Sequence, residues 1–139
     1  MKAIEGEAPM YKGLTLFNVA SALASHAGAR QSIIARNIAN SETPGFKARD
    51  LTSFGDAYAQ GGVRQALRTS RPGHQQTPLQ PNGAALVEGI VPGDAAPNGN
   101  TVSVETEMMK ASEVRFQHNM AVSVYRSGID LLRSGLGRG

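Results

Sequence analysis

The sequence contains no cysteine and no tryptophan, and it has few aromatic or charged residues. Without cysteine, a disulfide scaffold, a thiolate zinc site, an iron–sulfur cluster and a cysteine nucleophile are all excluded. The absence of thiols also suits an oxidising compartment. Aromatic residues make up 5% of the 139 residues and charged residues 18%, below the roughly 25% charge of an average soluble protein. A compact, enzyme-like globule is therefore not the first expectation.

The sequence also lacks a membrane-spanning run, because no apolar stretch approaches about 18 residues. Lys2 and Lys12 precede the fairly apolar residues 14–24, a pattern that imitates a secretory signal. Glu5 and Glu7 contradict it, since they lie where a signal would be basic, and helical periodicity continues through the supposed cleavage site. We therefore expect no cleaved signal peptide. The net charge of +3 is too small to argue for nucleic-acid binding.

Residues 13–40 are predicted to form a long helix after a polar leader, residues 1–12. Only Arg30 and Arg36 carry charge between Gly13 and Ala39, and a helix without charge all round is usually buried on several sides. Apolar residues recur at alternating steps of three and four, the spacing of a helix that packs against another helix. Gln31 is the one polar member of this stripe, whose other members are Phe17, Ala20, Ala24, Ala27, Ile34 and Ile38.

The end of this helix is marked by asparagine and by a turn. Asn37 and Asn40 are predicted to close the helix in the left-handed conformation. Pro44 and Gly45 then occupy the central positions of a type II turn. We assign residues 41–60 to this turn and its extension.

Residues 61–100 form a flexible middle segment in our interpretation. They hold seven glycines, five prolines and no aromatic residue, so they are expected to be extended or disordered in the free chain, with at most a short strand or two. The basic residues between 64 and 74 lack the interleaved aromatics of a nucleic-acid site. A solvated or partner-facing loop is the favoured interpretation.

Residues 101–139 are predicted to form a second long helix with Ser103 as its N-cap. Glu105 and Glu107 lie in its first turn, where the helix dipole favours negative charge. Arg115 and His118 are polar interruptions that we expect to set the register of a helix interface. The full stripe comprises Val104, Met108, Ala111, Arg115, His118, Val122, Tyr125, Ile129, Leu132 and Leu136.

No pattern of reactive residues points to catalysis. The histidines, His26, His74 and His118, are far apart and have no metal-ligand spacing. Neither a phosphate-binding glycine loop nor a serine nucleophile elbow is present. We therefore expect no enzymatic activity, no cofactor and no metal.

Two segments carry a resemblance to a known family. Residues 35–51, Ala-Arg-Asn-Ile-Ala-Asn-Ser-Glu-Thr-Pro-Gly-Phe-Lys-Ala-Arg-Asp-Leu, closely resemble the N-terminal signature of bacterial flagellar axial proteins, the rod and hook family. Residues 98–110, Asn-Gly-Asn-Thr-Val-Ser-Val-Glu-Thr-Glu-Met-Met-Lys, make a second match, most like subunits of the proximal rod. The resemblance implies a structural protein that stacks helically into a hollow shaft across the periplasm and transmits torque. It also implies export through the flagellar type III apparatus, without a cleaved signal peptide, and a place beside the membrane ring and its adaptor protein.

The expected fold is mostly α. The two terminal helices would pair as a coiled-coil-like bundle around an irregular middle, and the chain would fold fully only on assembly with other copies and other rod proteins. By resemblance, the family signature occupies Asn37, Ile38, Ala39, Asn40, Thr43, Pro44, Gly45 and Phe46. The remaining interface residues come from the two stripes: Phe17, Ala20, Ala24, Ala27, Ile34, Met108, Val122, Tyr125, Ile129 and Leu132. Another rod subunit of the same family, or a coiled-coil adaptor, remains the alternative.

Overall fold

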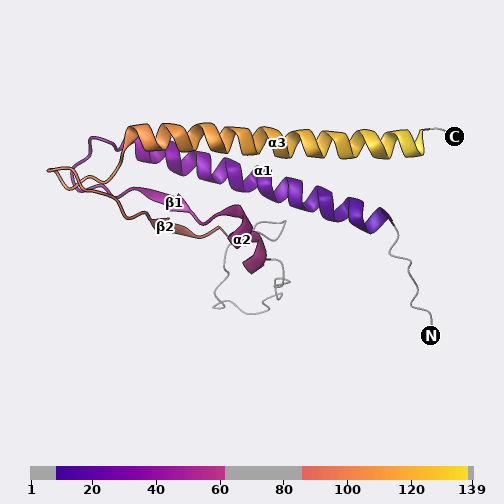
Figure 1. The fold of residues 1–139 in the computed structure, drawn as a ribbon, viewed down its shortest axis with the longest axis horizontal. Helices are drawn as coiled ribbons and strands as arrows, with labels where there is room; N and C mark the ends of the chain where they lie inside the picture. Colours follow the sequence, from indigo (N-terminus) through magenta and orange to yellow (C-terminus); the bar gives the residue numbers. More distant parts are fainter. Residues whose placement is uncertain (1–8, 62–85, 138–139) are drawn as a thin grey trace, which may run out of the picture.

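The computed structural model describes residues 9–61 and 86–137, and two long helices dominate it (Figure 1). The elements run in the order α1 (Pro9–Ala39), β1 (Arg49–Leu51), α2 (Phe54–Gly61), β2 (Glu88–Ile90) and α3 (Val104–Leu136). α1 and α3 lie side by side and antiparallel, while β1, β2 and α2 cover the side of α1 away from α3. The predicted mostly α fold with paired terminal helices is confirmed.

α1 begins at Pro9, so the last four residues of the predicted polar leader are helical. Proline suits the first position of a helix because its missing N–H would have no partner there. At the other end, no residue except glycine in the described part has a positive φ, so the predicted left-handed closure at Asn37 and Asn40 is wrong. Asn37 lies within α1, and the Asn40 side chain donates to the Arg36 carbonyl at 2.8 Å. The Arg36 carbonyl thus accepts two hydrogen bonds, since the Asn40 backbone N–H also donates to it, at 3.2 Å.

The predicted type II turn is present. Gly45 has a φ of 72°, which only glycine adopts readily, and the Phe46 N–H donates to the Thr43 carbonyl at 3.2 Å. The next segment forms β1, which pairs antiparallel with β2 in the register Arg49↔Ile90, Asp50↔Gly89 and Leu51↔Glu88. The expected short strand of the middle segment is therefore found at β2, and the expected basic loop, residues 64–74, lies outside the described residues.

α2 was not predicted, although its start has a recognisable signal. The Ser53 hydroxyl accepts from the Asp56 N–H at 3.3 Å and donates to the Asp56 carboxylate at 2.7 Å. A Ser-x-x-Asp spacing of this kind satisfies a free donor of the first turn. Ser103 begins α3 in a similar way, because its side chain accepts from the Thr106 N–H. The predicted N-cap of the second long helix is therefore confirmed.

The core between α1 and α3 consists of small and branched side chains. Ala27, Ile34 and Val114 form its buried centre, and Ile38 and Ala111 pack against it. Ala20, Ala27 and Ile34 recur at steps of seven on α1 and are all buried. The predicted α1 stripe therefore does face α3, although its polar member Gln31 is exposed.

The face of α3 that packs against α1 differs from the predicted stripe by one position. The buried residues are spaced by seven: Glu107, Val114, Ala121 and Gly128. Met108 and Leu132, which belong to the predicted stripe, are exposed, while Ala111 does pack on the core. The reason is close approach: a Cβ added at Gly128 would lie 2.8 Å from the Phe17 ring. The spacing of the large apolar residues missed Ala121 and Gly128, although Tyr125 of the predicted stripe packs edge-on against Phe17, with ring centroids 5.2 Å apart.

Candidate assembly interface

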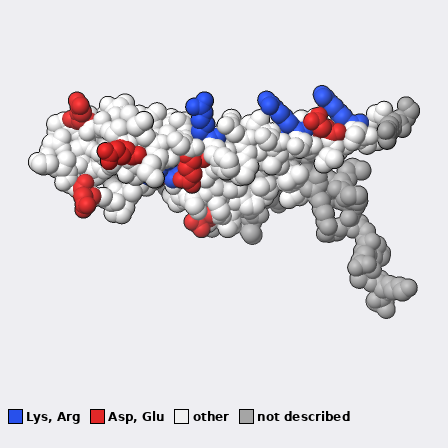
Figure 2. Space-filling model, turned by 45° about the horizontal axis from the view of Figure 1, so that its top comes forward, with Lys and Arg blue, Asp and Glu red and all other residues white. Residues whose placement is uncertain are grey.

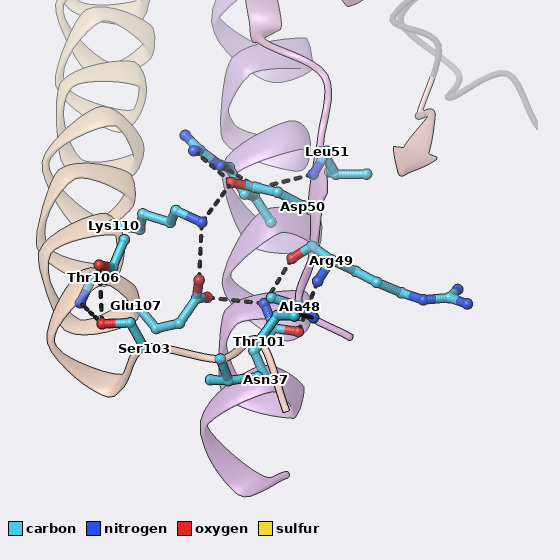
Figure 3. A network of polar contacts seen from close by, with 12 residues as sticks. Asn37, Ala48, Arg49, Asp50, Leu51, Thr101, Ser103, Thr106, Glu107 and Lys110 are labelled. Carbon is cyan, nitrogen blue, oxygen red and sulfur yellow. Dashed lines mark hydrogen bonds and ion pairs between the residues drawn. The ribbon is translucent and has the colours of Figure 1, made fainter. Parts of the chain in front are cut away.

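Asn37 joins three elements through one buried side chain (Figure 3). It is 0% exposed. Its Nδ2 donates to the Arg49 carbonyl at 2.6 Å and to Glu107 Oε2 at 2.9 Å, while its Oδ1 accepts from the Arg49 N–H at 3.2 Å. The carboxamide therefore pairs with the outer edge of β1 as a neighbouring strand would, and its second N–H reaches α3.

Glu107 is the α3 partner in this contact and is 2% exposed. A buried carboxylate is costly unless it is paired and hydrogen-bonded. Asn37 supplies one hydrogen bond, and Lys110 Nζ donates a second to Glu107 Oε1 at 2.9 Å. The helix dipole alone does not explain Glu107, because its carboxylate is buried against Asn37 of α1 rather than exposed to solvent.

Arg30 and Asp50 complete the network. Arg30 donates to both Asp50 oxygens, at 2.7 and 2.9 Å, and Lys110 Nζ lies 3.4 Å from Asp50 Oδ2. Arg30, Lys110, Asp50 and Glu107 therefore bring two positive and two negative charges together between α1, β1 and α3. We call these four residues and Asn37 the polar lock.

Arg30 and Asp50 stabilise each other's charged forms. Burial raises the pKa of Asp50, but the hydrogen bond and charge of Arg30, the Leu51 N–H and Lys110 outweigh it, so this pKa lies below its usual range. The hydrogen bond to Asp50 likewise raises the pKa of Arg30 against the opposing effect of burial. A bidentate arginine–carboxylate pair also fixes the orientation of both side chains, so the lock holds β1 at a defined position along α1.

His26 holds the far end of β1 against α1. The ring is buried, its Nε2 lies 2.9 Å from the Thr52 carbonyl oxygen, and Phe54 of α2 packs edge-on at 5.6 Å. This structural role of His26 is not among the sequence predictions. A sequence signal for a second buried face of α1 exists. Four residues at helical spacing lie on this face and are all buried: Ala22, His26, Ile33 and Asn37.

Asn100 joins the two motifs that carried the resemblance. Its Nδ2 donates to the carbonyls of Asn40 and Thr43, at 2.9 and 2.8 Å, and its Oδ1 accepts from the Val102 N–H. The side chain is buried. The end of α1 is therefore fastened to the segment that leads into α3, across 60 residues of sequence.

An open groove of about 430 Å³ lies between α1 and α3 beyond the core. The polar member of the α1 stripe, Gln31, meets Arg115 and His118 of α3 there. The polar interruption of the α1 stripe therefore lies at the same level of the helix pair as the polar interruption of the α3 stripe. The groove is lined by Ala27, Gly28, Gln31, Val114, Arg115, His118 and Asn119. The role of Arg115 and His118 in setting the register stays a prediction.

Comparison with known proteins gives a family match and several similar proteins. A family model described as flagella basal body rod protein matches residues 18–47, from α1 through the turn. The flagellar basal body rod protein FlgB of Agrobacterium fabrum is 30% identical over 117 residues, which cover 82% of this chain and 87% of that protein. The chain belongs to the FlgB family of flagellar basal-body rod proteins. FlgB of Salmonella typhimurium is 30% identical over 108 residues, covering 70% and 75% of the two chains. FlgB of Escherichia coli K12 is 29% identical over 120 residues, covering 76% and 84%.

The predicted interface residues of this FlgB-family chain divide by burial. Those that the helix pair itself buries are Ala20, Ala27, Ile34 and Asn37. Half-buried are Phe17, Ala24, Ile38, Asn40, Phe46, Val122 and Ile129. Tyr125 is exposed but also packs edge-on against Phe17. The other exposed residues are Ala39, Thr43, Pro44, Gly45, Met108 and Leu132.

Within residues 9–61 and 86–137, no group of three or more histidine, aspartate or glutamate side chains is placed to hold a metal ion. In the same residues, no helix is long and apolar enough to cross a membrane. The charged groups of the polar lock pair with each other. They therefore hold the two long helices and β1 in one defined geometry.

Proposed function

We propose that this chain is a structural subunit of the proximal part of the flagellar rod. Its relatives are named as basal-body rod proteins. The observation that carries the proposal is a helix pair that is fastened internally but leaves large apolar side chains on α3 open. Met109 and Leu131, for example, are 76% and 72% exposed. Exposed apolar surface of this extent is typical of a protein–protein interface.

Neighbouring subunits would cover these side chains and the uncharged outer face of α1. The expected partners are other copies of this chain and other rod proteins, with the membrane-ring protein and its adaptor at the base of the rod. Many lateral contacts between helices would together transmit torque, and the polar lock would keep each subunit from shearing internally. The flagellar type III export apparatus would deliver the chain without a cleaved signal peptide.

The nearest alternative is another position in the shaft, taken by a rod subunit of the same family. A coiled-coil adaptor is less well supported, because a soluble coiled coil carries charge on its outer faces. Among the α1 side chains that the structure describes, only Arg30 and Arg36 are charged, and both make ion pairs.

Complementation tests the proposal. The gene is deleted from its own host, and the strain is expected to be non-motile and to regain swimming with the wild-type chain. Isolated basal bodies from the complemented strain, imaged at near-atomic resolution, should place this chain at the membrane end of the rod. Normal swimming of the deletion strain, or density for the chain only in the distal rod, would contradict the proximal assignment.

A further inference from the structure

The groove between α1 and α3 is lined by polar side chains that have no partner within the part of the chain that the structure describes. Arg115 and His118 of α3 and Gln31 of α1 are exposed there, and they make neither a hydrogen bond nor an ion pair with the described residues. Among these residues, no acid lines the groove. Asp130, the next acid along α3, lies 15 residues beyond Arg115, or about 22 Å along the axis. The groove therefore carries one unpaired positive charge.

The groove also has room for side chains from outside. Its apolar lining consists of Ala27 and Val114, and a Cβ added at Gly28 would meet no atom within 4 Å. The volume of about 430 Å³ is in the range of pockets that hold ligands. A partner that fills the groove must bring apolar side chains for this lining and a negative charge for Arg115, because a charge that becomes buried needs a paired group.

A short apolar patch with one acid lies on α3 outside the groove. Its four members follow steps of four, three and four, so they share one face of the helix: Met109, Glu113, Phe116 and Met120. All four are exposed, and none of them lines the groove. Glu113 accepts a hydrogen bond from the Gln117 side chain at 3.2 Å and makes no ion pair with the described residues. We call these four residues the outer patch.

We infer that the groove is a carboxylate-binding site for the outer patch of a second copy, whose Glu113 pairs with Arg115 and His118. The guanidinium and an imidazole N–H donate to the carboxylate, and hydrogen bonds between charged groups are short and strong. Met109, Phe116 and Met120 supply the apolar side chains. Charged side chains are sparse on the face shown in Figure 2, where uncharged surface separates them, so one pair of opposite charges can select how two copies meet. The inference rests on the proposed function, which brings copies of the chain together.

The groove and the outer patch lie at the same level of α3 but on different sides of it. Glu113 and Arg115 are two residues apart, and residues at that spacing do not face each other on a helix. They therefore cannot pair within one copy. Each copy offers its groove to one neighbour and its outer patch to another, so the contact is heterologous and not reciprocal.

Filling the groove tests the site without disturbing the fold. The Cβ of Gly28→Leu meets no atom within 4 Å, and leucine favours a helix more than glycine does, so secretion and helix content should stay at or above the wild-type level. Incorporation into basal bodies should nevertheless fall about tenfold or more, because a filled groove leaves no room for the partner. Gly55→Leu, at another exposed helical glycine with open space around its Cβ, should swim like the wild type. Normal swimming of Gly28→Leu would overturn the inference.

Cysteine cross-linking identifies the occupant, because the chain has no cysteine of its own. Full-length Gly28→Cys and Phe116→Cys chains are co-expressed in the deletion strain, and its basal bodies are oxidised. We expect a reducible species of twice the 14.6 kDa chain mass, which is absent when either variant is expressed alone. Gly28→Cys with Leu131→Cys, an exposed position of α3 outside the outer patch, should give none. No cross-link of the first pair in motile cells, or an equal yield from the second pair, would overturn the inference.

Charge exchange provides a second readout that does not depend on thiol geometry. Arg115→Glu should abolish swimming, and adding Glu113→Arg to the same chain should restore much of it, because each copy again meets an opposite charge on its neighbour. Adding Glu105→Arg instead restores the net charge but not the pair, so it should not restore swimming. Equal swimming of the two double variants would contradict the pairing of Glu113 with the groove.

The proposed function and the groove contact fail in different ways. A wild-type chain that does not restore swimming to the deletion strain would refute the proposed function. A wild-type chain that restores swimming, together with Gly28→Leu and Arg115→Glu variants that swim normally, would refute the groove contact alone. Secretion of each variant serves as the export control.

Discussion

Replacing Asn37 by aspartate tests the polar lock with the smallest change of shape. The substitution exchanges the Nδ2 group for a carboxylate oxygen. Both donations of Nδ2 are lost, to the Arg49 carbonyl at 2.6 Å and to Glu107 Oε2 at 2.9 Å. In their place, the new carboxylate faces that carbonyl oxygen and the Glu107 carboxylate at hydrogen-bonding distance without a proton between them.

The expected cost is large for a single isosteric change. A hydrogen bond to a charged group contributes about 1.5–3 kcal/mol and a neutral one about 0.5–1.5 kcal/mol. Asn37 is 0% and Glu107 2% exposed, so water cannot replace either bond. With the repulsion between two carboxylates added, we expect Asn37→Asp to lower the free energy of unfolding by about 3–5 kcal/mol. This is a large part of the roughly 5–15 kcal/mol of a typical domain.

Urea unfolding followed by circular dichroism measures this change. For a denaturant slope of about 1–3 kcal/mol per molar urea, the midpoint should fall by at least about 1 M. Asn18→Asp is the matched control, since Asn18 lies exposed on the same helix, and it should change stability by no more than about 0.5 kcal/mol. If the isolated chain shows no cooperative transition, the amount of each variant that is incorporated into basal bodies should be compared instead, and Asn37→Asp should be incorporated less than Asn18→Asp. Equal behaviour of the two variants would refute the role of the polar lock.

Four further predictions follow from the helix pair. Gly128→Ala should lower the melting temperature, because the added Cβ would lie 2.8 Å from the Phe17 ring. Gly135→Ala is the control, since its Cβ would meet nothing within 4 Å, and it should raise the melting temperature slightly or leave it unchanged. The pKa of Asp50 is lowered in the folded protein, so its ion pair stabilises the fold at a pH above the pKa of about 3.9 that an aspartate has in the unfolded chain. This contribution should disappear as the pH falls below that value. Asp50→Asn should therefore flatten the dependence of the unfolding free energy on pH between 6 and 3. Ile34→Asp buries a charge in the core and should block rod assembly and swimming; normal motility would contradict this. Circular dichroism of the purified monomer should show fewer helical residues than the three helices contain, and a fully helical, cooperatively melting monomer would disprove folding on assembly.

The helices and the turn were predictable because local rules determine them. The steps of three and four from Phe17 to Ile38 need only the geometry of one helix, and Pro44-Gly45 needs only the geometry of one turn. Both agree with the structure, as does the cap at Ser103. The start of α1 was placed too late, since residues 9–12 carry no apolar stripe from which a helix could be predicted.

The register of α3 was not predictable from the spacing of large apolar residues. The distal α3 has apolar side chains on several faces, so periodicity alone did not distinguish the face that meets α1 from those left open. Ala121 and Gly128 mark the contact because they let the helix axes approach, and Gly128 leaves room for the Phe17 ring of α1. Small residues recurring at steps of seven on both helices would have predicted this face.

The polar lock lay beyond any local pattern. Glu107 and Asn37 are 70 residues apart, and each had a sufficient local explanation, as a helix-dipole acid and as a helix terminator. The pairing requires the turn to bring β1 back along α1, which depends on Asn100 fastening the end of α1 to the segment before α3. No sequence pattern indicated this contact between the two motifs, although both motifs were recognised by their resemblance to the family.

Burial separates two roles within the family signature. Asn37 points inward and its partners lie entirely within this chain, so its substitution should destabilise the subunit whether or not neighbours are present. Thr43 and Pro44 are exposed, and their backbone geometry is already fixed by Gly45 and by the Asn100 side chain. A change at Pro44 that preserves the turn should therefore leave the monomer unaffected and act only where another subunit covers this surface.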